Sequence, residues 1–442
     1  MPSNFSPADP VSRSESGVVA KLTRRLVPFL FLLYVVAYLD RINVGFAKLQ
    51  MSGQLHFSEA VYGLAAGMFF AGYFFFQVPS NLILARIGAR RWIALLMVVW
   101  GAISCSMMLV TTPRSFYALR FLLGLAEAGF FPGVILYLRN WFPASARART
   151  VALFMTAGPI SGVIGGPVSG ALLTLDRLGG LAGWQWLFLL EGIPAILLGI
   201  IVFLHLSDQP SDASWLSSEE RRWLASTLLE EDNAKSAALG VRENPWWSVF
   251  IDPRVCLLAF VYFCLATSSY GITLWLPSVV SHFSGRGTFV IGMLSAIPYI
   301  AAAVGMVVSG HHSDRTGERR WHVAGCALLA AAAFILAAIS TSTIAVVAAI
   351  SFSVLGINGM LGPFWAIPGS FLTGVTASAG IAMINSVGNL GGFVGPYILG
   401  LARSSSGNFR SGLLLLAGAM ALAAVFVLLV EMPRERTNPR EL

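Results

Sequence analysis

The stretch that decides the fold is FLFLLYVVAYLDRINVGFA, residues 29–47, in which an acid and a base interrupt an apolar run. Only about 14 apolar residues precede Asp40, whereas a helix needs about 20 to cross the ~30 Å of a bilayer's hydrocarbon. Val44 to Ala47 are therefore needed to complete a span, which places Asp40 and Arg41 inside it. A charge at the bilayer centre costs at least about 2.5–3.5 kcal/mol, so such residues are expected on an ion or substrate path.

The composition extends this interpretation to the whole chain. Mean hydropathy is +0.74 over 442 residues and 11% of residues are charged, against about a quarter in ordinary soluble proteins. Backbone polar groups must be satisfied within each span, which favours helices over open sheets. The net charge of +8 does not indicate nucleic-acid binding, because the basic residues are scattered through short loops.

Apolar runs separated by polar residues predict an all-α membrane protein with twelve spans. The expected spans are 26–48, 59–85, 91–111, 115–140, 149–174, 184–206, 254–282, 288–311, 321–341, 343–371, 375–402 and 410–431. The domains follow as a disordered N-terminal tail, 1–25, a six-helix bundle, 26–206, a central loop, 207–253, a second six-helix bundle, 254–431, and a C-terminal tail, 432–442. A surface helix is expected over Ser217 to Glu231.

The distribution of basic residues predicts the orientation. With the N-terminus inside, 21 of the 29 Lys and Arg residues fall in cytoplasmic segments, six in outer loops and two, Arg41 and Arg120, inside spans. Both termini are therefore expected in the cytoplasm. The four cysteines all fall in apolar spans without metal-ligand spacing, and no metal site is expected.

Two motifs recur at one offset and indicate an internal repeat. Arg86-Ile87-Gly88 recurs 229 residues later as Arg315-Thr316-Gly317, and Gly166-Pro167 recurs at the same offset as Gly395-Pro396. The two groups of six spans are therefore expected to share one fold. Carriers built from such repeats bind substrate near the midplane, between the halves.

The loop GHHSDRTGERR, residues 310–320, resembles the signature loop of the major facilitator superfamily, and the resemblance covers essentially the whole chain. The same loop in the first half, residues 81–91, is NLILARIGARR, with Asn81 and Ala85 in place of the signature Gly and Asp. A gating role is therefore better placed on Asp314.

Two further stretches, 38–47 and 120–133, resemble the first and fourth spans of the anion:cation symporter family, whose members carry sugar acids, tartrate, phthalate and aromatic acids. The resemblance implies a proton-coupled symporter in a bacterial inner membrane, importing a small organic anion by alternating access. Its expected partners are a carboxylate, protons and the bilayer, without another cofactor, and the default state is a monomer.

Helix geometry brings the charged residues to related depths. At 1.5 Å per residue, Arg41 lies about 10 Å and Arg120 about 8 Å below the outer surface, so the two could face one cavity. Glu127 lies two turns beyond Arg120 on the same face, and Tyr38 shares a stripe with Arg41. Arginine suits an organic anion because its planar fork binds a carboxylate bidentately and stays charged.

The two acids suit proton coupling. Burial raises the pKa of a carboxyl group and a nearby arginine lowers it, so a substrate that competes for the arginine would favour protonation. Asp40 and Glu127 are the predicted proton carriers. The alternative is that Asp40–Arg41 and Arg120–Glu127 are static ion pairs that only fix helix packing.

Other candidates follow in the second half and in the loops. The family resemblance implies substrate contacts at Asn385 and Trp365, and a helix broken around Pro363 and Pro368 would line a cavity. Tyr73, Gln77 and Tyr270 are weaker candidates; an interhelical hydrogen bond for Asn385 and simple packing for Trp365 are the alternatives. The predicted gating residues are Arg86, Gly88, Asp314 and Arg315.

The functional hypothesis is thus a proton:organic-anion symporter. Arg41 and Arg120 bind the carboxylate, and Tyr38, Tyr73, Trp365 and Asn385 shape the pocket. The nearest rival is a proton-coupled antiporter that exports drugs or metabolites, against which the two arginines count. A membrane-embedded enzyme would need clustered His, Cys or Ser–His chemistry at one depth, which the sequence lacks.

Overall fold

The computed structural model describes residues 10–238, 246–372 and 374–431, and every regular element within those ranges is a helix. The first bundle contains α1 (Pro10–Gln54), α2 (Glu59–Ile87), α3 (Ala89–Ser106), α4 (Pro113–Glu127), α5 (Phe130–Trp141), α6 (Ala144–Met155), α7 (Ala157–Leu172) and α8 (Gly183–His205). The second contains α10 (Pro253–Ser284), α11 (Thr288–Thr316), α12 (Arg320–Ile339), α13 (Thr343–Gly369), α14 (Gly374–Ser406) and α15 (Arg410–Leu428). Helix α9 (Ser218–Ala238) lies between them in the chain.

Eleven of the twelve expected spans are long and apolar enough to cross a membrane, with α4–α5 and α6–α7 each counted as one. The remaining span, expected over 375–402, is helix α14. At 33 residues it is long enough to cross, but glycines, serines and two asparagines lower its hydropathy. The all-α membrane fold is confirmed.

Local signals account for several helix boundaries. The Ser58 hydroxyl accepts a hydrogen bond from the backbone N–H of Val61 at the start of α2, and Thr112 and Ser115 form a capping box on α4. At the opposite terminus, Gly88 and Gly317 adopt positive φ angles of 86° and 71°, which favour glycine. The glycine of the repeated loop motif therefore ends α2 and α11 alike.

Two local expectations were wrong. The N-terminal tail is helical from Pro10, so the part of the expected disordered tail that the structure describes, residues 10–25, belongs to α1; residues 1–9 and 432–442 lie outside the described ranges. Pro363 and Pro368 also do not break their helix, because α13 runs without interruption from Thr343 to Gly369. Packing against neighbouring helices lets a membrane helix accommodate proline.

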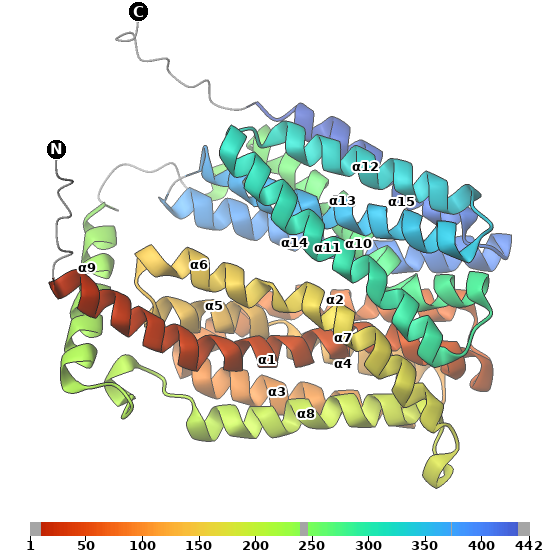
Figure 1. The fold of residues 1–442 in the computed structure, drawn as a ribbon, viewed down its shortest axis with the longest axis horizontal. Coiled ribbons are helices and arrows are strands. Elements are labelled where there is room, and N and C mark those ends of the chain that lie inside the picture. The colour runs from red at the N-terminus through yellow and green to blue at the C-terminus, as the bar shows by residue number, and fades with distance from the viewer. Residues whose placement is uncertain (1–9, 239–245, 373, 432–442) are drawn as a thin grey trace, which may run out of the picture.

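The bundles lie side by side with their long helices running in roughly one direction (Figure 1). Helix α9 crosses the end at which α1 begins, and this end is called the α9 end below. Helix α9 confirms the surface helix that was predicted over Ser217 to Glu231. Ion pairs hold it in place: Glu220 accepts from Lys21 of α1 at 2.7 Å, and Glu231 from Arg147 of α6 at 3.0 Å.

Candidate functional site

A cavity of about 860 Å³ lies between the two bundles and extends to the α9 end. Both halves of the repeat supply its wall, as expected for a carrier site between repeats. The polar lining residues are Tyr34, Arg41, Tyr73, Gln77, Asn81, Arg139, Tyr262, Tyr270, Asn385 and Asn389, and aromatic rings including Phe70, Phe130, Phe131 and Trp365 fill much of the remainder. Arg41, Tyr73, Trp365 and Asn385 were predicted from the sequence.

An ion pair joins Arg41 on the cavity wall to the carboxylate of Glu127. Arg41 donates from Nη2 at 2.8 Å and from Nε at 3.3 Å, both to Glu127 Oε2. The Arg41 side chain is 14% exposed and the Glu127 side chain is fully buried. A guanidinium has five N–H donors, so donors remain for a ligand in the cavity. Glu127 reaches Arg41 from the last residue of α4, where the helix stops before α5 begins.

Arg120 lies behind this pair and is fully buried, outside the cavity lining. Its Nε donates to the Ala65 carbonyl at 3.4 Å, while Nη1 and Nη2 have no hydrogen-bond partner. Both arginines contact the Phe69 ring, whose centroid lies 4.9 Å from the Arg120 guanidinium carbon and 5.3 Å from that of Arg41. The two arginines thus meet the same aromatic ring, but only Arg41 faces the cavity.

Asp40 points into the first bundle, away from the cavity. Its Oδ1 accepts from Ser104 of α3 at 2.6 Å and from Asn43 at 3.2 Å, and its Oδ2 has no partner. Neither ion pair of the static alternative is present, since Arg41 pairs with Glu127 instead of Asp40. Tyr38 is also outside the cavity lining, where its ring makes an edge contact with Tyr34 at 6.4 Å.

The second bundle contributes an aromatic and amide wall. Tyr262 of α10 packs on Trp365 of α13, with ring centroids 5.0 Å apart, and Tyr270 packs on Phe70 of the first bundle at 4.3 Å. Asn385 and Asn389, one turn apart on α14, add amide groups. Tyr262 and Asn389 were not predicted. The eight-residue spacing of Tyr262 and Tyr270, which is one helix face, was the available signal.

The predicted gating residues lie at the α9 end, outside the cavity lining. Gly88 joins α2 to α3, and Arg86 is in the last turn of α2. In the second half Asp314, in the last turn of α11, accepts from Arg319 at 2.6 Å, and Arg315 beside it is exposed.

At the opposite end, polar contacts hold the two bundles together. Glu59 of α2 accepts from Lys48 of α1 at 2.8 Å and from Arg403 of α14 at 3.3 Å, so one carboxylate joins cations from both bundles. The Lys48 ammonium also lies 4.7 Å from the Trp275 ring of α10. The Tyr62 hydroxyl donates to the Leu274 carbonyl at 2.7 Å. These contacts close the end that lies away from α9.

Glycines bring the helix backbones together at this closed end in two places that the repeat relates. A Cβ on Gly292 of α11 would lie 2.2 Å from the Gly166 carbonyl oxygen of α7, and one on Gly63 of α2 would lie 2.8 Å from the Pro396 carbonyl oxygen of α14. Gly63 and Gly292 are separated by the 229-residue offset of the repeat, as are Gly166 and Gly395. No side chain fits at these contacts.

We therefore expect Gly292→Ala to separate the bundles at the closed end. Spin labels on cysteines introduced at Arg177 and Arg286, in exposed loops of the two bundles, should show a longer distance in most molecules. Gly418→Ala on α15 is the matched control, since nothing lies within 4 Å of a Cβ there. An unchanged distance distribution in Gly292→Ala would contradict the assignment of this end as a close backbone contact.

Comparison with known proteins adds three findings. Residues 30–396 match the model of the Major Facilitator Superfamily. The chain is 49% identical to a "Putative tartrate transporter" of Agrobacterium vitis, over 96% of this chain and 93% of the relative. It is 41% identical to a "Quinolone resistance transporter" of Acinetobacter baumannii, over 96% and 98%.

The fold is also similar to a crystal structure of a bacterial homologue of the human lysosomal transporter Spinster, in an inward-facing and occupied conformation. The TM-score is 0.76 with 17% identity, over 92% of this chain and 96% of that one.

Proposed function

The chain belongs to the Major Facilitator Superfamily, whose members are transporters and not enzymes, and we propose that it imports a small organic acid together with protons. The observation that carries the proposal is the Arg41–Glu127 pair on the cavity wall. It places Arg41, a carboxylate-binding group in the cavity lining, in direct contact with the buried carboxylate of Glu127, which can take up a proton. The similarity to a tartrate transporter favours a hydroxylated dicarboxylate as the substrate.

Competition between the substrate carboxylate and Glu127 for Arg41 couples substrate binding to proton binding. A substrate carboxylate that takes up the donors of Arg41 deprives Glu127 of its counter-ion. A buried carboxylate without a counter-ion is costly, so Glu127 takes a proton when substrate binds. Asp40, away from the cavity, is retained as a second proton carrier. The asparagines of α14 and Trp365 contact the remainder of the substrate.

The direction of access follows from the orientation predicted by the basic residues. The α9 end faces the cytoplasm of a bacterial inner membrane, and the cavity that extends to it is open inward. Outward opening then requires the Lys48–Glu59–Arg403 cluster and the glycine contacts to separate, while Arg86, Gly88, Asp314 and Arg315 close the α9 end.

The test uses purified protein in liposomes with tartrate outside. An inward proton gradient should drive accumulation, and a protonophore should abolish it. Tartrate should also raise the melting temperature of the detergent-purified protein with concentration, because it binds only the folded state. If no carboxylate among tartrate, sugar acids and aromatic acids is taken up or stabilises the protein, the proposal fails.

Export by proton antiport is the second candidate, favoured by the 41% identity to a quinolone resistance transporter. It predicts that a quinolone, and not tartrate, stabilises the protein. It also predicts that a proton gradient drives the quinolone in the direction opposite to the protons.

A further inference from the structure

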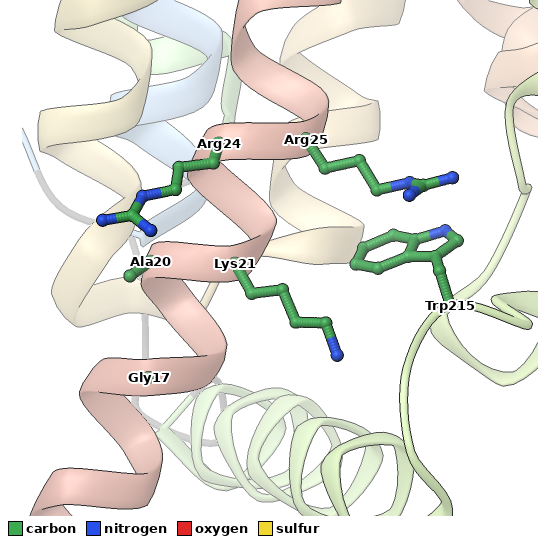
Figure 2. Close-up of a pocket in the computed structure, with 6 residues that line it drawn as sticks. All are labelled: Gly17, Ala20, Lys21, Arg24, Arg25 and Trp215. Carbon is green, nitrogen blue, oxygen red and sulfur yellow. The ribbon is translucent and has the colours of Figure 1, made fainter.

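A second pocket, of about 560 Å³, lies at the α9 end and shares no lining residue with the central cavity. Figure 2 shows the residues that line it. Its lining consists of Gly17, Ala20, Lys21, Arg24 and Arg25 from one stretch of α1, and Trp215 from the segment that precedes α9. All five α1 residues are exposed. Because Gly17 and Ala20 have almost no side chain, they leave room in the pocket beside the cationic side chains.

The pocket has an excess of positive charge. Lys21 pairs with Glu220 at 2.7 Å, and that hydrogen bond lowers the pKa of the Glu220 carboxyl, which keeps it ionised. Arg25 and Arg24 remain as two further cations. Figure 2 shows Arg25 directed toward Trp215 and Arg24 on the other side of α1. Guanidinium groups bind phosphate oxygens through paired N–H donors.

Trp215 gives the pocket a fixed aromatic wall. Its ring stacks on the buried Trp141 with centroids 5.7 Å apart and planes 10° apart. Its other contact is the Arg25 guanidinium, whose carbon lies 4.9 Å from the ring centroid. The stacking holds Trp215, and Trp215 in turn positions Arg25.

An exposed apolar side chain lies above the cations on α1. Leu32 is 45% exposed and lies two turns beyond Arg25 on the same face of α1, a rise of about 10 Å. A ligand that contacts both the cations and Leu32 has an anionic group joined to a hydrocarbon chain. Free phosphate or another soluble anion would contact only the cations.

We propose that this pocket binds the phosphate headgroup of an anionic phospholipid in the leaflet at the α9 end, with an acyl chain along the face of α1 that bears Leu32. Basic residues beside a membrane span attract anionic lipid by about 1 kcal/mol each. The bound lipid contacts α1 and the segment between the two bundles at once.

The experiment titrates the intact detergent-purified protein with phosphatidylglycerol and counts bound lipid by native mass spectrometry. Arg24→Gln/Arg25→Gln should weaken binding about 25-fold, the product of two losses of about fivefold each. The matched control is Arg177→Gln/Arg286→Gln, which removes two exposed cations at the other end and should bind as the wild type does. Phosphatidylcholine should bind the wild type much more weakly than phosphatidylglycerol.

Two outcomes would overturn the proposal. One is equal phosphatidylglycerol binding by wild type and Arg24→Gln/Arg25→Gln. The other is displacement of the lipid by glycerol phosphate or inorganic phosphate at equal concentration, which would assign the pocket to a free anion. If the double variant does not fold, photo-crosslinking of a diazirine phosphatidylglycerol to the wild type decides. Labelling should fall on residues 17–32 or on Trp215, and labelling elsewhere alone would reject the site.

Discussion

Replacing Arg41 by alanine should abolish carboxylate uptake, with a loss of at least about 100-fold. Two arginines line the cavity, Arg41 and, at its mouth, Arg139, and the substitution removes the first of them. It also leaves the buried carboxylate of Glu127 without its ion-pair partner. A hydrogen bond to a charged group contributes about 1.5–3 kcal/mol, so losing the two that Arg41 can offer a carboxylate corresponds to a factor of a hundred or more. Initial rates of tartrate uptake into liposomes measure the effect.

A double variant separates loss of binding from loss of folding. Arg41→Gln/Glu127→Gln leaves no buried charge at the pair, so we expect it to recover the melting temperature that Arg41→Ala loses, and still to transport nothing. Arg286→Ala, an exposed cation at the closed end, should transport normally. Uptake by Arg41→Ala at a rate near that of the wild type would show that the carboxylate binds elsewhere.

Replacing Glu127 by glutamine should separate transport from the proton gradient. The amide preserves the size of the side chain and an oxygen that can accept from Arg41, but it cannot take up a proton. Accumulation driven by an inward proton gradient should fall to the level of passive equilibration. Exchange of external labelled tartrate for internal unlabelled tartrate should persist, because it requires no net proton movement.

Glu191→Gln is the matched control for this prediction. Glu191 is a further buried carboxylate of the first bundle, outside the cavity lining, and accepts from Ser169 at 2.8 Å. Its removal should leave proton-driven accumulation intact. If Glu127→Gln still accumulates substrate and Asp40→Asn does not, the proton is carried by Asp40 alone.

The helices were predictable because a span needs about 20 apolar residues, and that length shows directly in the sequence. Arg41 and Asn385 were predictable for a related reason, since a charge or amide at depth must meet a partner or a cavity. The 229-residue offset also relates Tyr270, which was a weaker candidate from the sequence, to Arg41.

The side of each helix that meets the cavity was not predictable. Arg120 and Glu127 share a face by spacing, yet α4 turns that face toward Phe69 and Ala65 of α2, and Arg120 is buried there. The end of α4 after Glu127 is marked in the sequence by Gly129 and Pro132, but the rotation of α4 relative to α1, which pairs Glu127 with Arg41, is not. Asp40 turns inward because Ser104 of α3 supplies a donor, and contacts between distant segments leave no signature in spacing.

The glycine contacts at the closed end also have a kinetic consequence. Side chains that interlock must leave their rotamers before two surfaces part, and each such step adds to an activation barrier. The helices contact each other there through backbone atoms, at Gly166 with Gly292 and at Gly63 with Pro396, and no side chains interlock at these contacts. Separation there breaks little more than van der Waals contact, so the two bundles can part and meet again many times without repacking. The polar contacts that must break there are then few: the ion pairs of Glu59 and the hydrogen bond from Tyr62 to the Leu274 carbonyl.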